Sequence, residues 1–532
     1  MLGDQDTQKE ITTLGIGATA AHLTLDQAIG VRIPDSQPKF FKTTDEIIPL
    51  FRNKTGRGIF AYQGRASHML TFIIIYAVIL VVLGAIIGRK AKTASDFFVA
   101  GRNFNSGLLF TTLIAANLGA GSTVGVTALA YTHGLSAWWW IGSAGIGSMI
   151  LAFVIGPKIW RISREKNFYT LSDYLDERYS KFFSGIISLM MSAGTLALFS
   201  GQLLGIAWIL EVVADVPKTH GVIYGAIVTT LYFSAGGLLS SAIVNIIEVA
   251  VILIGFVIAL PYALTYAGGL EGIKASVNSE TYFDFFGMGS TAIIGYIVML
   301  VPSFFISPGL IGKVFAAKNE HAIKTGTAMN GIVQLIFAVI PVIIGMCAYS
   351  CFPGLERADL ALPTAMKNMM PFYAASIALA AIFAAEVSTA DTVLYMLAGS
   401  LVNDLYRRFI NPDISDKRLL WSSRITSLIC GIIGVILALR LESLISALTI
   451  FYSLMSVSLA APLIFGLFTE RASNAGAILS SLLGAGLTVY MTFGGFNGGI
   501  DVMGVRLNAS TCGIILSFIV MSLSMLKRNS PE

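Results

Sequence analysis

Charged side chains are scarce in this chain, because Asp, Glu, Lys and Arg together make up 12% of its 532 residues. Soluble proteins average roughly 25% charged residues, so a large soluble enzyme is excluded. Cysteine (4) and histidine (5) are few and scattered, and neither residue predicts a transition-metal site or a nucleophile–base pair. We therefore expect no catalytic residues, no enzymatic activity and no nucleic-acid partner.

Long apolar runs are abundant instead: 55% of the residues are apolar, and the mean hydropathy is +0.76. A helix of about 20 apolar residues crosses the roughly 30 Å hydrocarbon core of a bilayer. We predict thirteen such spans, numbered 1 to 13 in chain order: 69–88, 106–131, 135–157, 183–213, 221–237, 240–266, 289–312, 327–351, 373–402, 419–439, 443–468, 474–494 and 507–526. The chain is thus expected to be an all-α polytopic protein of the cell membrane, with the lipid bilayer as its surroundings.

Lys and Arg are unevenly distributed between the two sides of these spans. One side carries 21 of them, Lys313 included, and the opposite short loops carry six. Because cytoplasmic loops are enriched in Lys and Arg, this bias places the C-terminus in the cytoplasm and the polar tail, residues 1–68, outside. No signal peptide is evident, since Asp4, Asp6 and Glu10 stand where a basic region is expected.

Two spans are interrupted by residues that ordinary membrane helices avoid. Span 2 carries glycines and hydroxyls over 115–125, and span 7 carries Pro302–Ser303 and Ser307–Pro308–Gly309. Such breaks free backbone groups at the membrane midplane, which is tolerable only around a site lined by protein. A packed kink would account for either break alone. Corresponding breaks in two halves of a chain are typical of inverted-repeat secondary transporters, which bind their ligands there.

Three carboxyl groups are expected at membrane depth: Glu248 in span 6, and Glu386 and Asp391 in span 9. A carboxylate at the bilayer centre costs roughly 2.5–3.5 kcal/mol, so such residues are functional candidates. None has an obvious Lys or Arg partner at this depth. Each must then be protonated, face water or neutralise a bound cation.

One face of span 9 is rich in oxygen atoms. At 100° per residue, Ala385, Ser388, Thr389 and Thr392 share this face, which presents the hydroxyl and carbonyl oxygens that hard cations prefer. Ser and Thr hydroxyls can also bond back to their own helix, in which case they only pack it. The residues by themselves leave these two interpretations open.

Several motifs in the same order make the chain similar to the sodium/solute symporter family over roughly residues 69–528. The strongest match is Ala384–Thr389 running on to Asn403–Arg407. Supporting matches are Ala115–Asn117, Gly236–Leu238, and Pro308 followed by 313–318. The resemblance implies a leucine-transporter-type fold, in which spans 2–6 and 7–11 form two inverted five-helix repeats with one extra helix before and two after them.

These implications divide the chain into five parts. They are the tail (1–68), the first helix with a cytoplasmic loop (69–105), the first repeat (106–268), the second repeat (269–468), and the last two helices with a short cytoplasmic tail (469–532).

The resemblance also implies an ion site. It assigns the principal Na⁺ site to the backbone carbonyls of Ala115, Leu118 and Ala385 and to the hydroxyls of Ser388 and Thr389. A second ion or proton position is expected among Asp391, Thr392, Asn245, Glu248 and Glu386. Since the family usually has an acid where this chain has Asn245, we hypothesise that the negative charge has moved to Asp391.

The solute is expected to bind between the two breaks. The residues implied are Ser122, Thr123, Trp140, Gln202, Phe304, Ser307 and Pro308. The expected function is the Na⁺-coupled import of a small organic solute by alternating access, with Na⁺ as the coupling ion. A proton-coupled symporter and a transporter-like solute sensor are the alternatives. The sequence names neither the solute nor the oligomeric state.

Overall fold

The computed structural model describes residues 57–88, 98–277, 280–441, 443–494, 499–502 and 505–526. The first helix, α2, spans Arg57–Gly88 and begins before the expected boundary of the tail at residue 68. The remainder of the expected tail, residues 1–56, lies outside the described residues.

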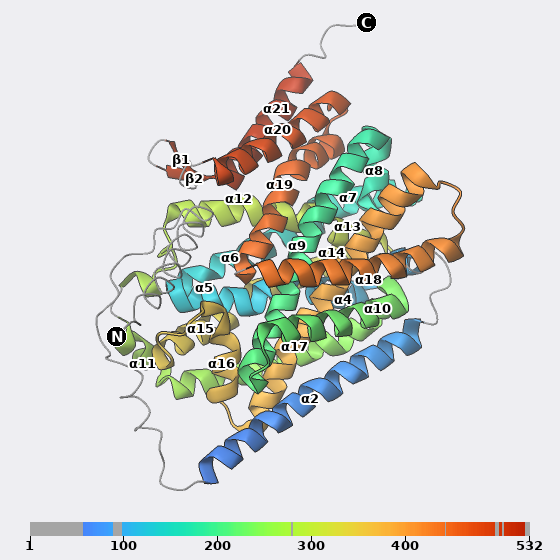
Figure 1. Ribbon diagram of the computed structural model, residues 1–532. Coiled ribbons are helices and arrows are strands. Elements are labelled where there is room, and N and C mark those ends of the chain that lie inside the picture. Colours follow the sequence, from blue (N-terminus) through green and yellow to red (C-terminus); the bar gives the residue numbers. More distant parts are fainter. Residues whose placement is uncertain are drawn as a thin grey trace, which may run out of the picture.

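Helices make up nearly all of the described chain (Figure 1). In the first half they are α4 (Ser106–Asn117), α5 (Val126–His133), α6 (Trp138–Ile150), α7 (Gly156–Lys166), α8 (Leu171–Arg178), α9 (Lys181–Ala214), α10 (Lys218–Tyr266) and α11 (Gly269–Ser276). In the second half they are α12 (Ser290–Ile306), α13 (Pro308–Phe315), α14 (Glu320–Phe337), α15 (Val339–Cys351), α16 (Ala361–Asn368), α17 (Phe372–Ala398), α18 (Asp416–Arg440), α19 (Leu444–Phe468), α20 (Asn474–Phe493) and α21 (Ala509–Leu526).

Short 3-10 and π segments connect or extend several of these helices. They are η3 (Ala100–Arg102), η4 (Gly121–Gly125), η5 (Gly134–Ala137), η6 (Leu151–Ile155), η7 (Glu280–Phe283), η8 (Ala358–Leu360) and η9 (Gly399–Ile410). Of these, η4, η6 and η9 are π-helical. A π-helix is rare and is found most often at functional positions.

Each expected span overlaps one or more helices, but the count of thirteen is not confirmed. Among the described residues, eleven helices are long and apolar enough to cross a membrane. One reason is that residues 121–166 form a run of helical segments that merges part of span 2 with span 3. The other is that spans 5 and 6 both lie in α10, whose 49 residues would measure about 74 Å if straight.

A short β-hairpin departs from the all-α expectation. Strand β1 (Gly499–Val502) pairs antiparallel with β2 (Val505–Asn508), between α20 and α21. The expected span 13 therefore begins as a strand at 507 and becomes helical only at Ala509.

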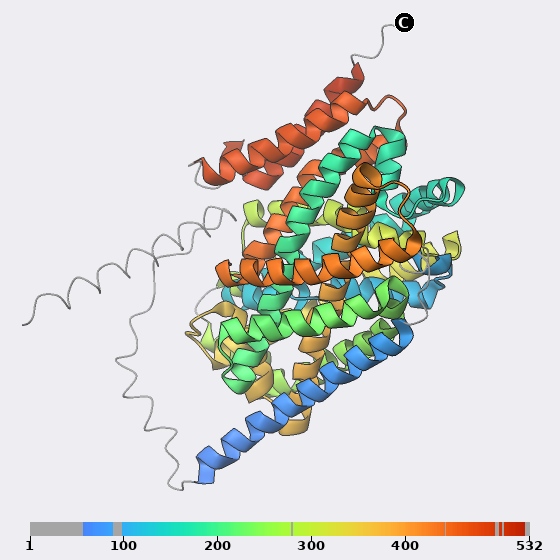
Figure 2. The same cartoon turned by 45° about the vertical axis from the view of Figure 1, so that its right-hand side comes forward.

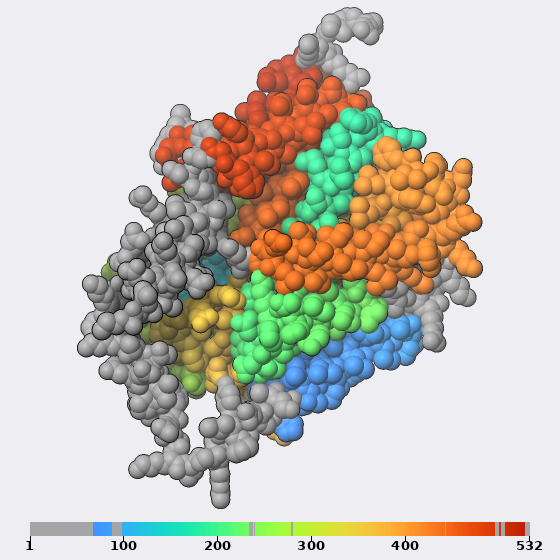
Figure 3. All heavy atoms as spheres, in the orientation of Figure 1, coloured from blue at the N-terminus to red at the C-terminus, as the bar shows by residue number. Residues whose placement is uncertain are grey.

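The outer helices carry their apolar side chains on the outside. On the face shown in Figure 3, α2, α10 and α18 lie side by side at the surface, and α10 contacts both neighbours. Ile75, Ile254 and Ile432 on these three helices are each more than half exposed. Apolar surface on this scale suits contact with lipid. Figures 1 and 2 place α2 at one edge of the bundle and the α20–α21 pair at the opposite edge.

Helix α17 forms the centre of the bundle. All but three of its 27 residues are buried, and it packs most extensively against α10 and also against α9, α2 and α18. Small residues make this packing close: a Cβ atom added to Gly255 of α10 would lie 2.3 Å from the Cβ of Ala381. The oxygen-rich face of span 9 is therefore enclosed by protein.

Replacing Gly255 with alanine should destabilise the protein, because the added methyl group forces α10 away from α17. Overpacking of this kind costs about 1–3 kcal/mol, and the melting temperature of the purified protein measures it. Gly486→Ala is the matched control, since no atom lies within 4 Å of a Cβ at that exposed helical position. Equal melting temperatures for the two variants would contradict the close packing.

Candidate ion and solute site

The predicted break in span 2 is present, and side chains from elsewhere satisfy the backbone groups that it frees. Helix α4 ends at Asn117, and Leu118 leaves helical geometry with φ −95° and ψ 56°. The Ala120 N–H, displaced from the helical ladder, donates to Gln202 Oε1 of α9 at 2.9 Å. Ser122 Oγ donates to the Asn117 carbonyl at 2.6 Å. Gln202 and Ser122 thus stabilise the break itself.

The second break separates α12 from α13 at Ser307, whose φ of −53° and ψ of 123° interrupt the helix. Pro308 then begins α13, a position where its missing N–H costs nothing. On the α12 side, Ser303 Oγ donates to the Met299 carbonyl at 2.7 Å and lies 2.7 Å from Ser456 Oγ of α19. Both predicted interruptions therefore exist.

Oxygen atoms of α17 meet oxygen atoms of α4 at the first break. Ser388 Oγ lies 3.0 Å from the Ala115 carbonyl and 3.1 Å from the Ala385 carbonyl. Thr389 Oγ1 also lies 3.0 Å from the Ala115 carbonyl. Leu118, which caps α4, has its carbonyl outside the helical hydrogen-bond ladder. The sequence left open whether these hydroxyls bond back to their own helix or face a cation site. Ser388 does bond its own helix, and it also contacts the Ala115 carbonyl of α4.

Gly119 makes this contact between the helices possible. A Cβ atom at this position would lie 2.3 Å from Thr389 Oγ1 and 2.5 Å from Thr389 Cβ. Any larger residue would therefore push the threonine away from the Ala115 carbonyl.

The structure corrects the expectation that the membrane-embedded acids lack a basic partner. Lys313 of α13 is fully buried, with 0% exposure, although the sequence suggested a loop residue. Its Nζ donates to the Thr112 carbonyl at 2.7 Å and to Thr392 Oγ1 at 2.9 Å. Asp391 interacts electrostatically with Lys313 and accepts a hydrogen bond from Ser241 Oγ of α10.

Asn245 and Glu248 of α10 complete this cluster. With the Asn245 amide oxygen facing Thr112 Oγ1 at 3.2 Å, its NH₂ group donates to Glu248 Oε2 at 2.8 Å. Glu248 interacts electrostatically with both Asp391 and Lys313. Four of the five residues expected at a second ion position, those at 245, 248, 391 and 392, therefore gather around Lys313.

Glu386 lies apart from this cluster and faces α9. Its Oε1 accepts a hydrogen bond from Thr123 Oγ1 at 3.1 Å, and its Oε2 is buried without a hydrogen-bond partner among the described residues. A Cβ atom at Gly205 would lie 2.7 Å from the carboxyl group. Positions 386 and 391 differ by five residues, which turns them about 140° apart on a helix.

A cavity of about 420 Å³, open solvent included, is lined by Thr389, which follows Ser388 in the chain. Among the described residues that line it, none is charged. Its polar and aromatic lining comprises Asn117, Ser303, Phe304, Ser307, Thr389, Thr392, Phe451 and Tyr452. The Phe304 and Tyr452 rings stack with centroids 5.7 Å apart.

The expected solute residues are distributed differently around this cavity. Phe304 and Ser307 line it, and Pro308 lines a smaller cavity further along α17. Trp140 packs its ring against Tyr296 and Tyr452, behind the lining. Gln202, Ser122 and Thr123 are engaged in hydrogen bonds at the first break.

Sequence reasoning missed Asn117, Tyr452 and Lys313. Asn117 belongs to the Ala115–Asn117 motif, which was a usable signal. Tyr452 comes from α19, outside both breaks, and no local pattern in the sequence distinguishes it.

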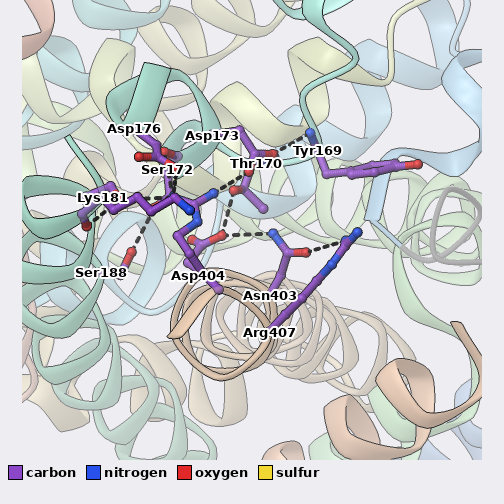
Figure 4. Close-up of polar contacts among 12 residues, drawn as sticks. Tyr169, Thr170, Ser172, Asp173, Asp176, Lys181, Ser188, Asn403, Asp404 and Arg407 are labelled. Atoms are coloured by element: carbon purple, nitrogen blue, oxygen red, sulfur yellow. Dashed lines mark hydrogen bonds and ion pairs between the residues drawn. The ribbon is translucent and has the colours of Figure 1, made fainter. Parts of the chain in front are cut away.

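The far end of α17 continues as η9 and is attached to α8 by polar contacts (Figure 4). Thr170 Oγ1, just before α8, donates to Asp404 Oδ1 at 2.6 Å. Arg408 pairs with Asp173 at 2.5 Å and donates to the Ser172 carbonyl at 3.0 Å. Asp404 of the Asn403–Arg407 motif and the following Arg408 therefore fix the end of the helix that carries Ser388.

Comparison with known proteins identifies the family of this chain. Residues 97–484 match the model of the sodium:solute symporter family. The chain belongs to this family. Among curated relatives, the sodium/pantothenate symporter of Escherichia coli is 27% identical over 77% of this chain and 88% of its own. The sodium/glucose cotransporter of Vibrio parahaemolyticus is 24% identical over 80% of this chain and 86% of its own.

A solved structure of a Na⁺-coupled sialic acid symporter, substrate-bound and outward-open, has the same fold. It superposes with a TM-score of 0.73 and 17% identity, covering 87% of this chain and 98% of that one. The expected leucine-transporter-type fold is thereby confirmed. This member of the sodium:solute symporter family is a polytopic membrane transporter and not an enzyme.

Arg408→Ala should destabilise the protein, because it leaves the carboxylate of Asp173 without its partner in a half-buried setting. Loss of one charged partner costs about 1–3 kcal/mol, which lowers the melting temperature. Arg418→Ala, at an exposed position on α18, is the control and should leave it unchanged. If the two variants have the same melting temperature, the contact between η9 and α8 contributes nothing measurable to the stability of the protein.

Proposed function

We propose that this protein is a Na⁺-coupled symporter that imports a small organic solute by alternating access. The observation that carries the proposal is the convergence of neutral oxygens at the first break. Ser388 Oγ and Thr389 Oγ1 of α17 lie 3.0 Å from the Ala115 carbonyl of α4. No observation favours the proton-coupled or sensor alternatives over this one.

The donor set fits Na⁺ as the coupling ion. Hard cations prefer oxygen ligands, and this set comprises hydroxyl and carbonyl oxygens, which suit a small monovalent ion. Ser388 is fully buried and Thr389 is nearly so. The proposed ligands are the carbonyls of Ala115, Leu118 and Ala385 with the two hydroxyls.

Coupling follows from the position of this site between two helices of different repeats. We propose residues 106–268 and 269–468 as the two repeats, so that α4 belongs to the first and α17 to the second. An ion that binds both helices favours the arrangement in which they meet. An ion with equal affinity for the outward and inward states would shift nothing, so this difference is what drives transport.

The solute is proposed to bind in the cavity beside the Na⁺ site, with Phe304 and Ser307 in its wall and Trp140 and Pro308 nearby. The role proposed for Ser122, Thr123 and Gln202 is to stabilise the first break through their hydrogen bonds. A cavity whose described lining is uncharged suits a small solute with polar groups and an apolar part. The names of the relatives, which mention glucose, pantothenate and sialic acid, fit a small organic nutrient.

Na⁺ should raise the melting temperature of the detergent-purified protein relative to K⁺ at equal ionic strength, because a ligand of the native state stabilises it. Ser388→Ala should weaken Na⁺ binding at least tenfold, or about 1.4 kcal/mol. The same assay over sugars, amino acids, carboxylates and vitamins identifies the solute.

Ser376→Ala is the control for this test. Ser376 is a buried serine of the same helix, and its hydroxyl bonds only its own turn among the described contacts. A Na⁺ response that survives in Ser388→Ala as fully as in Ser376→Ala would contradict the assigned site.

The C-terminus is proposed to be cytoplasmic and the N-terminal tail extracellular, in the cell membrane. The support for this orientation is the excess of Lys and Arg residues on one side. Their number there falls only from 21 to 20 when the buried Lys313 is left out. An epitope tag at the C-terminus should bind antibody only after cells are permeabilised, and a tag at the N-terminus should bind in intact cells. The reverse pattern would overturn the orientation.

A further inference from the structure

Two polar layers, one helical turn apart, join α4 to α17. In the first layer, the Ala115 carbonyl meets the hydroxyls of Ser388 and Thr389. In the second layer, the Thr112 carbonyl and Thr392 Oγ1 both accept hydrogen bonds from Lys313 Nζ. The steps from 115 to 112 and from 388 to 392 are each about one turn of helix.

The two layers differ in charge. The first consists of neutral oxygens. The second contains two acids and a base, each almost completely buried: Glu248 and Lys313 are 0% exposed and Asp391 is 1% exposed. Buried charges persist only when they are paired and hydrogen-bonded.

Lys313 Nζ is held as a small cation would be held. It donates to a backbone carbonyl at 2.7 Å and to a threonine hydroxyl at 2.9 Å. Asp391 and Glu248 act on it electrostatically from beyond the 4.0 Å distance of an ion pair. Oxygen ligands of this kind, beside carboxylates, otherwise attract a metal cation.

Two further side chains hold the acids in place. Ser241 Oγ donates to Asp391, and the Asn245 amide links Glu248 to Thr112 Oγ1. Thr392 Oγ1 also lies 3.3 Å from the Ser388 carbonyl, which ties the second layer to the first. A cation in one layer is therefore close to the oxygens of the other.

We propose that the ammonium group of Lys313 is a built-in cation that takes the place of a second coupling ion, so that the protein carries one Na⁺ per transport cycle. The inference rests on the proposed Na⁺-coupled function and adds its stoichiometry. Because the ammonium is covalently attached, its single charge offsets one of the two buried carboxylates in every state and contributes nothing to coupling. A second Na⁺ at these oxygens would be repelled by it.

Equilibrium binding of ²²Na⁺ to the purified full-length chain tests the stoichiometry without knowledge of the solute. The wild type should bind one saturable Na⁺ per chain, with a Hill coefficient of about 1. Lys313→Met keeps the length of the side chain and removes its charge, so it should bind two saturable Na⁺ per chain. Lys313→Arg keeps the charge and should bind one.

Asp391→Asn is a second variant. It removes one of the two buried carboxylates, so it leaves fewer acids without a counterion than Lys313→Met does. It should still bind one saturable Na⁺, because the second layer holds no Na⁺ in the wild type. The double variant Lys313→Met/Asp391→Asn should lose the extra ion gained by Lys313→Met. If Lys313→Met does not fold, the wild type and Asp391→Asn decide the question.

Two saturable Na⁺ in the wild type, a loss of one in Asp391→Asn, or a single Na⁺ in folded Lys313→Met would each overturn the inference. The proposed function has its own readout in the same assay, since Ser388→Ala should weaken Na⁺ binding at the wild-type site at least tenfold. Failure of the wild type to bind any Na⁺ removes both proposals. A single wild-type site that is weakened in Ser388→Ala, with no second ion gained by folded Lys313→Met, overturns the role of Lys313 alone.

Discussion

A polar group inside a bilayer must find its partner within the protein, and most features of this transporter depend on that constraint. Each break in a helix frees backbone groups. At each break, a side chain of another helix forms a hydrogen bond with a backbone group. The Ala120 N–H donates to Gln202 of α9, and the Met299 carbonyl of α12 accepts a hydrogen bond from Ser456 Oγ of α19. The same constraint brings Lys313 to two buried acids. The site is built from groups that could not remain where they are without one another.

Close approach to α17 is the second requirement, and three glycines on different segments provide it. A Cβ atom at Gly119, Gly205 or Gly255 would lie less than 3 Å from Thr389, Glu386 or Ala381. Each glycine faces a different side of α17, towards the first break, α9 and α10. The helix that carries the oxygen-rich face is therefore enclosed on several sides, and its hydroxyls are held at a fixed distance from α4.

The chemistry of the two layers between α4 and α17 suits a division of roles. Neutral oxygens can bind a cation and release it again, because they carry no charge that must be neutralised afterwards. Buried carboxylates need a permanent counterion, and Lys313 supplies one from α13. Further along, the contacts of Asp404 and Arg408 with the segment at α8 fix the end of η9. Movement of α17 relative to α4 must then involve both its oxygen-rich face and this end.

The sequence by itself determined the features that are local: the apolar spans, the two breaks, the oxygen-rich face of span 9 and the family. Hydropathy, proline and glycine, and helical period act over a few turns, so they are readable in one dimension. Only the tertiary structure decided where Lys313 lies, because a lysine at a helix end beside Lys318 is indistinguishable in sequence from a loop residue. It also placed Glu386 apart from Asp391, and it brought Gln202 into a hydrogen bond with the backbone at the first break. These outcomes depend on contacts between residues 79 to 263 positions apart, and burial of charge is decided by such contacts.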